Sequence, residues 1–239
     1  MLGPELETYQ GNKVVIFFAA LLALGPAALL YFAFTATPRD NAFRIIAAVL
    51  FALPAYYLAW LMSLRVTLHR DGITYHSLLS EKEMRWDRVE RFGYEATRRS
   101  IHFIPIGPYY LFRLRDAEGN KIRIGNRIAH PAKLGEKLVE LTTPGLYRKA
   151  LDQYNTGQEL DFGVIRVSRT NGVKVRKIFH YREIPWDQVS SFAIQQGRFY
   201  VWEVGKKRTV GWDLHHVFNA FALLGLLQSV MSPGNEAKG

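Results

Sequence analysis

The stretch VVIFFAALLALGPAALLYFAFTA, residues 14–36, runs for 23 positions without a charged residue. A second uncharged stretch, IIAAVLFALPAYYLAWLMSL at residues 45–64, follows a short polar link. About 20 helical residues cross a bilayer core, and a helix that is apolar on every side lies in a membrane or in a large core. A chain of 239 residues is too small to bury two such helices. The sequence therefore predicts a transmembrane helical hairpin over residues 14–64.

The alternative for the first stretch is a cleaved signal peptide. The stretch is longer than the 7–15 apolar residues typical of signal peptides, and the segment before it carries two acids against Lys13. Pro26 and Pro54 lie inside the two stretches, where membrane helices tolerate proline. We therefore expect residues 1–13 to be a cytoplasmic tail and both stretches to stay in the membrane.

Basic residues near the two stretches predict the orientation of the hairpin. Two of them, Arg39 and Arg44, lie in the link. The other side of the membrane would hold five: Lys13, Arg65, Arg70, Lys82 and Arg85. Because positive charge favours the cytoplasmic side, both termini and all soluble parts should be cytoplasmic. The absence of cysteine is compatible with either compartment.

The chain also contains an internal duplication. Five residues of one segment recur exactly one hundred positions later in a second segment, around a shared Trp-Asp-x-Val-x-x-Phe motif. They are Gly72, Trp86, Asp87, Val89 and Phe92, which recur as Gly172, Trp186, Asp187, Val189 and Phe192. A period of this length is the size of a domain, so it predicts two similar domains rather than a solenoid.

Each copy has the pattern of antiparallel strands followed by one helix. Asp71-Gly72 and Asn171-Gly172 are hairpin turns, and alternating stretches at 110–115 and 121–124 predict a further pair of strands. The second copy has matching stretches at 198–204 and 209–212. Closing helices are predicted from Pro131, with Leu134, Leu138 and Leu141 on one face, and around Val217, Phe221, Leu224 and Leu227. Residues 142–145 should interrupt the first of these helices, and residues 154–157 should end it.

These features resemble bacterial PH-like domains of the membrane-associated kind. Residues 160–163, 184–187 and 217–219 are similar to an uncharacterised bacterial family with such folds, and the resemblance covers about residues 65–230. It implies an α+β protein with two PH-like β-barrels or sandwiches, each closed by a helix, and it supplies no ligand. The expected organisation is a tail at 1–13, the hairpin at 14–64, PH-like domains at 65–157 and 158–231, and a disordered tail at 232–239.

The recurring residues are best interpreted as structural. Trp86 and Trp186 are large enough to plug a small barrel. Asp87 and Asp187 precede a short turn, where an N-cap or turn acceptor is needed, and Asn219 has the pattern of a helix cap. Contact with a ligand is the alternative for these residues.

No catalytic, cofactor-binding or metal-binding motif accompanies this fold. The seven histidines have no metal-ligand spacing, and the neighbours His215 and His216 should point to different faces. There is no nucleophile elbow, phosphate loop or kinase-like motif. We therefore expect no enzymatic activity, no cofactor and no metal, with an enzyme whose site leaves no local signature as an alternative.

The soluble part carries the whole net charge of +10, which suits a domain held beside anionic lipid. No nucleic-acid recognition motif accompanies this charge, so nucleic acid is not expected as a partner. Two surfaces are candidates for contact with a membrane or partner. The first contains Arg98, Arg99, Phe103, Ile104 and Ile106; the second contains Lys206, Lys207 and Arg208. The alternative for the first is packing between the two domains or under the membrane helices, and the alternative for the second is a solvated turn.

The sequence thus predicts a membrane-anchored binding or scaffolding protein without catalytic activity. Its PH-like domains would engage lipid headgroups or a protein partner at the cytoplasmic face of a bacterial inner membrane. The alternative is an accessory or regulatory subunit of a membrane protein complex, such as a transporter.

Overall fold

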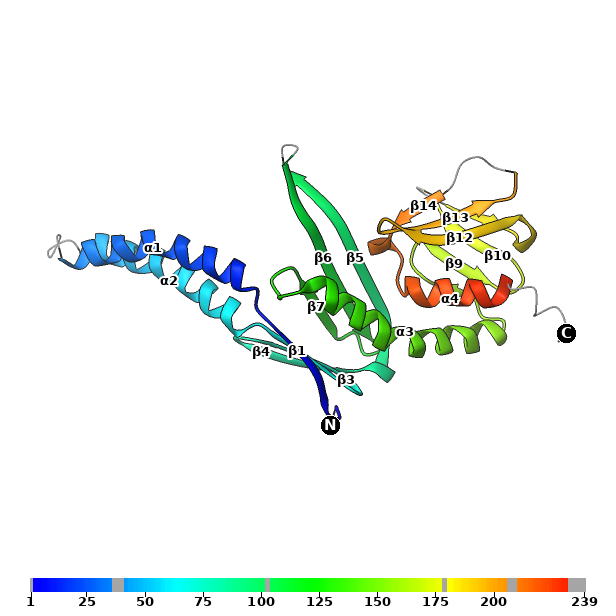
Figure 1. The fold of residues 1–239 in the computed structure, drawn as a ribbon, viewed down its shortest axis with the longest axis horizontal. Coiled ribbons are helices and arrows are strands. Elements are labelled where there is room, and N and C mark those ends of the chain that lie inside the picture. The colour runs from blue at the N-terminus through cyan, green and yellow to red at the C-terminus, as the bar shows by residue number, and fades with distance from the viewer. Residues whose placement is uncertain (1, 36–40, 102–103, 178–179, 206–209, 232–239) are drawn as a thin grey trace. The chain divides into compact units, whose positions relative to one another are not determined.

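The computed structural model describes residues 2–35, 41–101, 104–177, 180–205 and 210–231 (Figure 1). It is a mixed α/β fold in which two apolar helices near the N-terminus are followed by β-sheets and a C-terminal helix, which confirms the coarse fold class. The chain forms two compact units, Met1–Arg85 with Asn126–Pro131, and Trp86–Gly125 with Ala132–Gly239.

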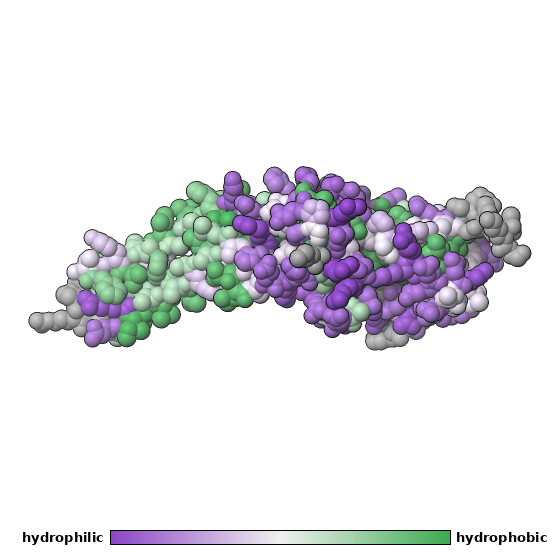
Figure 2. Space-filling model, turned by 90° about the horizontal axis from the view of Figure 1, so that it is seen from below, coloured by the Kyte–Doolittle hydropathy of each residue, from purple (hydrophilic) through white to green (hydrophobic). Residues whose placement is uncertain are grey.

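The first unit contains the apolar hairpin. Helices α1 (Lys13–Thr35) and α2 (Asn41–Ser63) are each long and apolar enough to span a membrane. Most of their large apolar side chains are exposed, and Figure 2 shows the hydrophobic surface that results. Arg44 near the start of α2 donates hydrogen bonds to the carbonyls of Ala33 and Phe34, at 3.4 and 3.5 Å. These bonds satisfy carbonyl groups that the end of a helix leaves without partners.

A four-stranded antiparallel sheet completes this unit, in the order β1-β2-β3-β4. Its strands are β1 (Glu5–Gln10), β2 (Arg65–His69), β3 (Gly72–Ser77) and β4 (Ser80–Arg85). The sequence predicts only a tail before the hairpin, whereas in the structure β1 pairs with β2 from Glu5 to Gln10. The backbone N–H of Gly11 donates to the carbonyl of Leu64 at 2.9 Å. The apolar hairpin is therefore inserted between two paired strands.

The second unit begins with a three-stranded antiparallel sheet of β5 (Val89–Ile101), β6 (Ile104–Asp116) and β7 (Lys121–Gly125). Helix α3 (Pro131–Asn155) follows and begins and ends where the sequence predicts. The predicted interruption at residues 142–145 was wrong. Pro144 and Gly145 are exposed within a continuous helix, while Leu138, Thr142 and Leu146 on both sides of them are buried. Packing of this buried face outweighs the single backbone hydrogen bond that proline removes.

The remaining strands form two sheets closed by helix α4 (Ala220–Met231). One sheet has the order β11-β10-β9-β8 and the other β12-β13-β14. The strands are β8 (Leu160–Asp161), β9 (Ile165–Ser168), β10 (Gly172–Arg176), β11 (Tyr181–Ile184), β12 (Val189–Gln195), β13 (Arg198–Glu203) and β14 (Val210–Asp213). The shared core of these sheets and α4 includes the fully buried Phe199 and Leu223. The predicted helix face was partly wrong, because Val217 precedes α4 and the fully buried side chains of the helix are Leu223, Leu226 and Leu227.

The order of elements confirms the duplication. A four-stranded antiparallel sheet, a 3₁₀ turn at the Trp-Asp motif, a three-stranded sheet and a helix occur twice in the chain. The same isolated antiparallel bridge also recurs, from Gly11 to Ile128 and from Gly163 to Val217. The first repeat therefore begins at β1, and the apolar hairpin occupies the place of the short connection between β8 and β9 in the second repeat.

The recurring motif has a structural role that differs in part from the expectation. Trp86 and Trp186 are half-buried, so they do not plug a barrel. The indole N–H of Trp186 donates to the carbonyls of Ser168 and Arg169, both at 3.2 Å, and its ring meets that of Tyr154 edge to face. The tryptophan thus fastens a turn to α3 from outside the core.

The two aspartates and the two glycines of the motif also have defined places. Asp87 and Asp187 lie inside the 3₁₀ turns Trp86–Arg88 and Trp186–Gln188, and Pro185 occupies the N-cap of the second turn. The N-cap expectation was therefore wrong. Gly172 has φ +81°, and a Cβ atom there would lie 2.3 Å from the carbonyl oxygen of Ile184. A Cβ atom on Gly72 would similarly lie 2.5 Å from the carbonyl oxygen of Met84, so close strand approach explains why glycine recurs.

Candidate functional site

Five cationic side chains lie on the same face of the β5-β6-β7 sheet. Neighbouring side chains of a strand point to opposite faces, and the opposite face holds the buried Phe92, Leu114 and Ile122, which are paired in one row. The cations occupy the two flanking rows: Arg91, Arg113, Arg115, Lys121 and Arg123. We call this set the basic sheet face.

The strand register places these cations directly opposite one another. Arg113 is paired with Arg123, and Arg115 is paired with both Lys121 and Arg91. Like charges directly opposite each other destabilise a sheet, on the scale of roughly 0.2–1 kcal/mol for a cross-strand pair. A sequence that breaks a local rule of stability in this way is most often found at a functional site.

A cavity of about 360 Å³ lies over this surface. Its lining consists of the whole basic sheet face together with Leu114, Ile122 and Phe218. The guanidinium of Arg91 lies 5.1 Å from the centre of the Phe218 ring, in cation–π geometry. Leu114 and Ile122 belong to the buried face, so Phe218 supplies the apolar side chain of this lining. The site is therefore a concave, mainly cationic surface rather than a scatter of exposed charges.

Arg91 and Arg113 are held in place by carboxylates. Arg91 lies 3.4 Å from Asp161, and Arg113 lies 3.6 Å from Glu95. Arg113 also donates to the carbonyl of His215 at 3.4 Å, and within the described part of the chain its buried Nε has no hydrogen-bond partner. The other three cations, Arg115, Lys121 and Arg123, are exposed.

The second repeat shows that the fold does not require these charges. In its β12-β13-β14 sheet, the positions of Arg113 and Arg115 are held by Tyr200 and Trp202, whose rings lie 5.6 Å apart. Gly211 replaces Arg123. The cationic face is thus a property of the first repeat alone.

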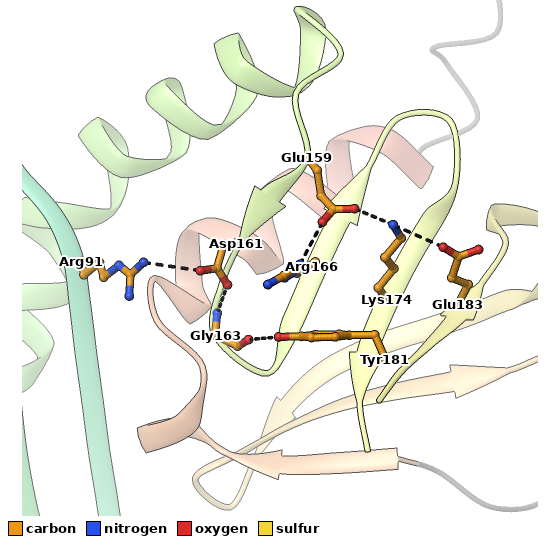
Figure 3. A network of polar contacts seen from close by, with 8 residues as sticks. All are labelled: Arg91, Glu159, Asp161, Gly163, Arg166, Lys174, Tyr181 and Glu183. Atoms are coloured by element: carbon orange, nitrogen blue, oxygen red, sulfur yellow. Dashed lines mark hydrogen bonds and ion pairs between the residues drawn. The ribbon is translucent and has the colours of Figure 1, made fainter. Parts of the chain in front are cut away.

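The β8-β11 sheet carries a different kind of charged surface (Figure 3). Lys174 lies 2.7 Å from Glu159 and 3.2 Å from Glu183, and Arg166 lies 3.3 Å from Glu159. The hydrogen bond from Lys174 is the main cause that lowers the pKa of Glu159, and hydrogen bonds to Glu159 and Glu183 raise the pKa of Lys174. Each cation here has an acidic partner, so this network is self-neutralising and serves the structure.

His215 and His216 were expected to point to different faces, but their ring centres lie 3.7 Å apart in a 3₁₀ turn. Burial, and then the charge of His215, lower the pKa of His216. Among the described residues, no group of three or more His, Cys, Asp or Glu side chains could hold a metal ion. The pair therefore has no third ligand of these types within the described part of the chain.

Asn219 lies at the N-terminal cap position of α4, as expected, and its carbonyl accepts from the N–H of Leu223 at 2.9 Å. Its side chain ties this end of the helix to the edge of β5. Its Oδ1 accepts from the backbone N–H of Phe92 at 2.6 Å, and its Nδ2 donates to the carbonyl of Glu90 at 2.7 Å. Its own N–H donates to the carbonyl of Phe92 at 2.8 Å. Asn219 has φ +53°, and His130 has φ +51° at the same place before α3.

The contact surfaces predicted from the sequence fall largely outside the described side chains. The backbones of Arg98, Arg99, Ile104 and Ile106 lie in the β5–β6 hairpin, where Arg98 pairs with Pro108 and Arg99 with Gly107. Their side chains, and the whole of Phe103, Lys206, Lys207 and Arg208, lie outside the described residues.

The basic sheet face was not predicted from the sequence. The signal for it was present in two of the predicted strands. Arg113 and Arg115 lie on either side of an apolar residue in one strand, and so do Lys121 and Arg123 in the other. Alternation places two charges of each strand on one face. The strand pairing that brings the four together is not visible in the linear sequence.

A family model matches residues 1–236, and its description is "Family of unknown function (DUF6585)". No curated protein matches the chain. Because the match covers nearly the whole chain, the protein belongs to this uncharacterised family.

Proposed function

We propose that this member of the family is a membrane-anchored, non-catalytic binding protein. Its two repeats are PH-like domains, and they engage anionic lipid headgroups at the cytoplasmic face of a bacterial inner membrane. The resemblance of the repeats to membrane-associated PH-like domains supports the fold name and the location. The net charge of +10, which resides outside the hairpin, supports attraction to an anionic surface.

The observation that carries this proposal is the position of the apolar hairpin. The chain leaves the sheet after β1, forms α1 and α2, and returns to the sheet as β2, which pairs with β1. The hydrogen bond from Gly11 to Leu64 closes the base of the hairpin directly at the sheet. A bilayer that holds the helices would thus hold this sheet at its surface without a flexible linker.

The second candidate function is an accessory subunit of a membrane complex. It is favoured by the exposure of large side chains on the hairpin, since Phe17, Leu22 and Leu53 are each more than half exposed. Membrane helices associate in part through van der Waals packing, and these exposed side chains are available for it. Co-purification in a mild detergent distinguishes the two functions, because an accessory subunit should retain its complex.

The experiment that tests the proposal combines membrane extraction with vesicle capture. The full chain should remain in membranes after alkaline carbonate treatment, and a reporter at its C-terminus should be active only on the cytoplasmic side. Proteoliposomes of neutral lipid that contain the chain should then capture anionic vesicles more strongly than neutral vesicles. Equal capture of both vesicle types, or release from membranes by carbonate, would contradict the proposal.

A further inference from the structure

We infer that the basic sheet face is a binding site for a ligand that carries at least two phosphate groups. This inference rests on the proposed function in one respect only, the lipid source of the phosphates. The site itself is argued from strand register, charge and the cavity above the β5-β6-β7 sheet.

The spacing of the cations suits two phosphate groups. Paired residues on adjacent strands are about 5 Å apart, and alternate residues of one strand are about 7 Å apart. Arg113 and Arg115 on β6 and Lys121 and Arg123 on β7 therefore mark the corners of a small rectangle. Guanidinium groups bind phosphate oxygens through two parallel hydrogen bonds, which makes arginine the preferred residue for such recognition.

The charges around the site favour an anionic ligand. Cations paired across strands repel one another, and in the second repeat the matching positions carry Tyr200 and Trp202 instead. A bound polyanion would remove this repulsion.

The boundaries of the site favour a compact ligand. Glu95 lies beyond the row of Arg113, and Glu118 lies in the turn beyond the row of Arg115. A nucleic acid needs a longer basic track for its successive phosphates. Acids beyond both rows of cations therefore favour a headgroup or a small soluble polyphosphate.

The test uses the full chain in nanodiscs of neutral lipid, titrated with inositol hexakisphosphate, pyrophosphate and orthophosphate. The variant R115Q/R123Q removes two exposed cations from the site. The control R148Q/R176Q removes two exposed cations from other surfaces of the same unit. The two polyphosphate probes should bind more tightly than orthophosphate. Their affinity should fall about tenfold or more in R115Q/R123Q, equivalent to about 1.4 kcal/mol, and remain unchanged in the control.

Equal loss of affinity in the two variants would show attraction by net charge alone and would overturn the inference. Absence of polyphosphate binding to the unaltered chain would also overturn it. Nanodiscs with phosphomonoester lipids form the second arm, in which competition with the soluble probes assigns a lipid source. Binding of soluble probes without such competition supports the site and assigns it a soluble ligand.

Failure of this inference is distinguishable from failure of the proposed function. A chain that resists carbonate extraction and captures anionic vesicles equally well with R115Q/R123Q would keep its proposed function and lose this site. A chain that is released by carbonate yet binds polyphosphate through Arg115 and Arg123 would keep the site and lose the membrane anchor.

Discussion

Replacement of Asn219 by alanine should loosen the attachment of α4 to the edge of β5. The side chain of Asn219 makes two hydrogen bonds, one from the N–H of Phe92 at 2.6 Å and one to the carbonyl of Glu90 at 2.7 Å. The backbone of Asn219 is left-handed, with φ +53°, a conformation that asparagine tolerates better than alanine.

The expected loss in free energy of unfolding follows from the two hydrogen bonds and the backbone conformation. Each of the two hydrogen bonds contributes about 1 kcal/mol net. The left-handed conformation costs alanine about 1 kcal/mol more. The total for N219A is therefore about 3 kcal/mol, and N219G, which loses the bonds without this strain, should cost about 2 kcal/mol.

Hydrogen exchange of the full chain in neutral detergent measures this effect where it arises. The amide of Phe92 should exchange about a hundredfold faster in N219A, since each 1.4 kcal/mol is tenfold in an equilibrium constant. The increase should be smaller in N219G, and amides of the hairpin α1–α2 serve as the internal control. Unchanged exchange at Phe92 in N219A, or faster exchange in N219G than in N219A, would refute the reasoning.

Three further predictions concern the second repeat. W186F should lower the free energy of unfolding by about 1 kcal/mol, because it removes the indole hydrogen bond and keeps a ring beside Tyr154; an unchanged denaturation midpoint would contradict this. G172A should cost about 3 kcal/mol in the same assay, since its Cβ atom would meet a carbonyl oxygen at 2.3 Å and φ is +81°; a wild-type midpoint would exclude this close approach. The lowered pKa of Glu159 stabilises the fold above the unfolded value near 4.3, and this contribution is lost as the pH falls through the folded pKa. Unfolding of E159Q should therefore depend less on pH in acid than unfolding of the unaltered chain, and an identical pH profile would disprove the contribution.

Much of the fold could be predicted from local signals. Two long uncharged stretches predicted α1 and α2, because an apolar run of about 20 residues is long enough to cross a bilayer as a helix. Asp71-Gly72 and Asn171-Gly172 identified the turns between β2 and β3 and between β9 and β10, since glycine follows a short polar residue at each. The recurring Trp-Asp motif identified the duplication.

The features that were missed depend on long-range packing. Strand β1 pairs with β2 across the whole hairpin, so no neighbouring segment indicates its partner. Helix α3 continues through Pro144 because its buried face is held by other parts of the second unit. The basic sheet face arises from the register of β5, β6 and β7, and this register turns two separate Arg/Lys alternations into one surface.

We propose that the apolar hairpin is a membrane anchor inserted between two strands of a duplicated fold. Excision of the hairpin tests it most directly, with Gly11 joined to Leu64 through a short glycine linker. These two residues are already hydrogen-bonded at 2.9 Å, so a short linker closes the gap. We expect a chain that no longer sediments with membranes, stays monodisperse without detergent and retains slow amide exchange in β1 and β2. Aggregation, loss of protection in β1, or continued residence in membranes would contradict it.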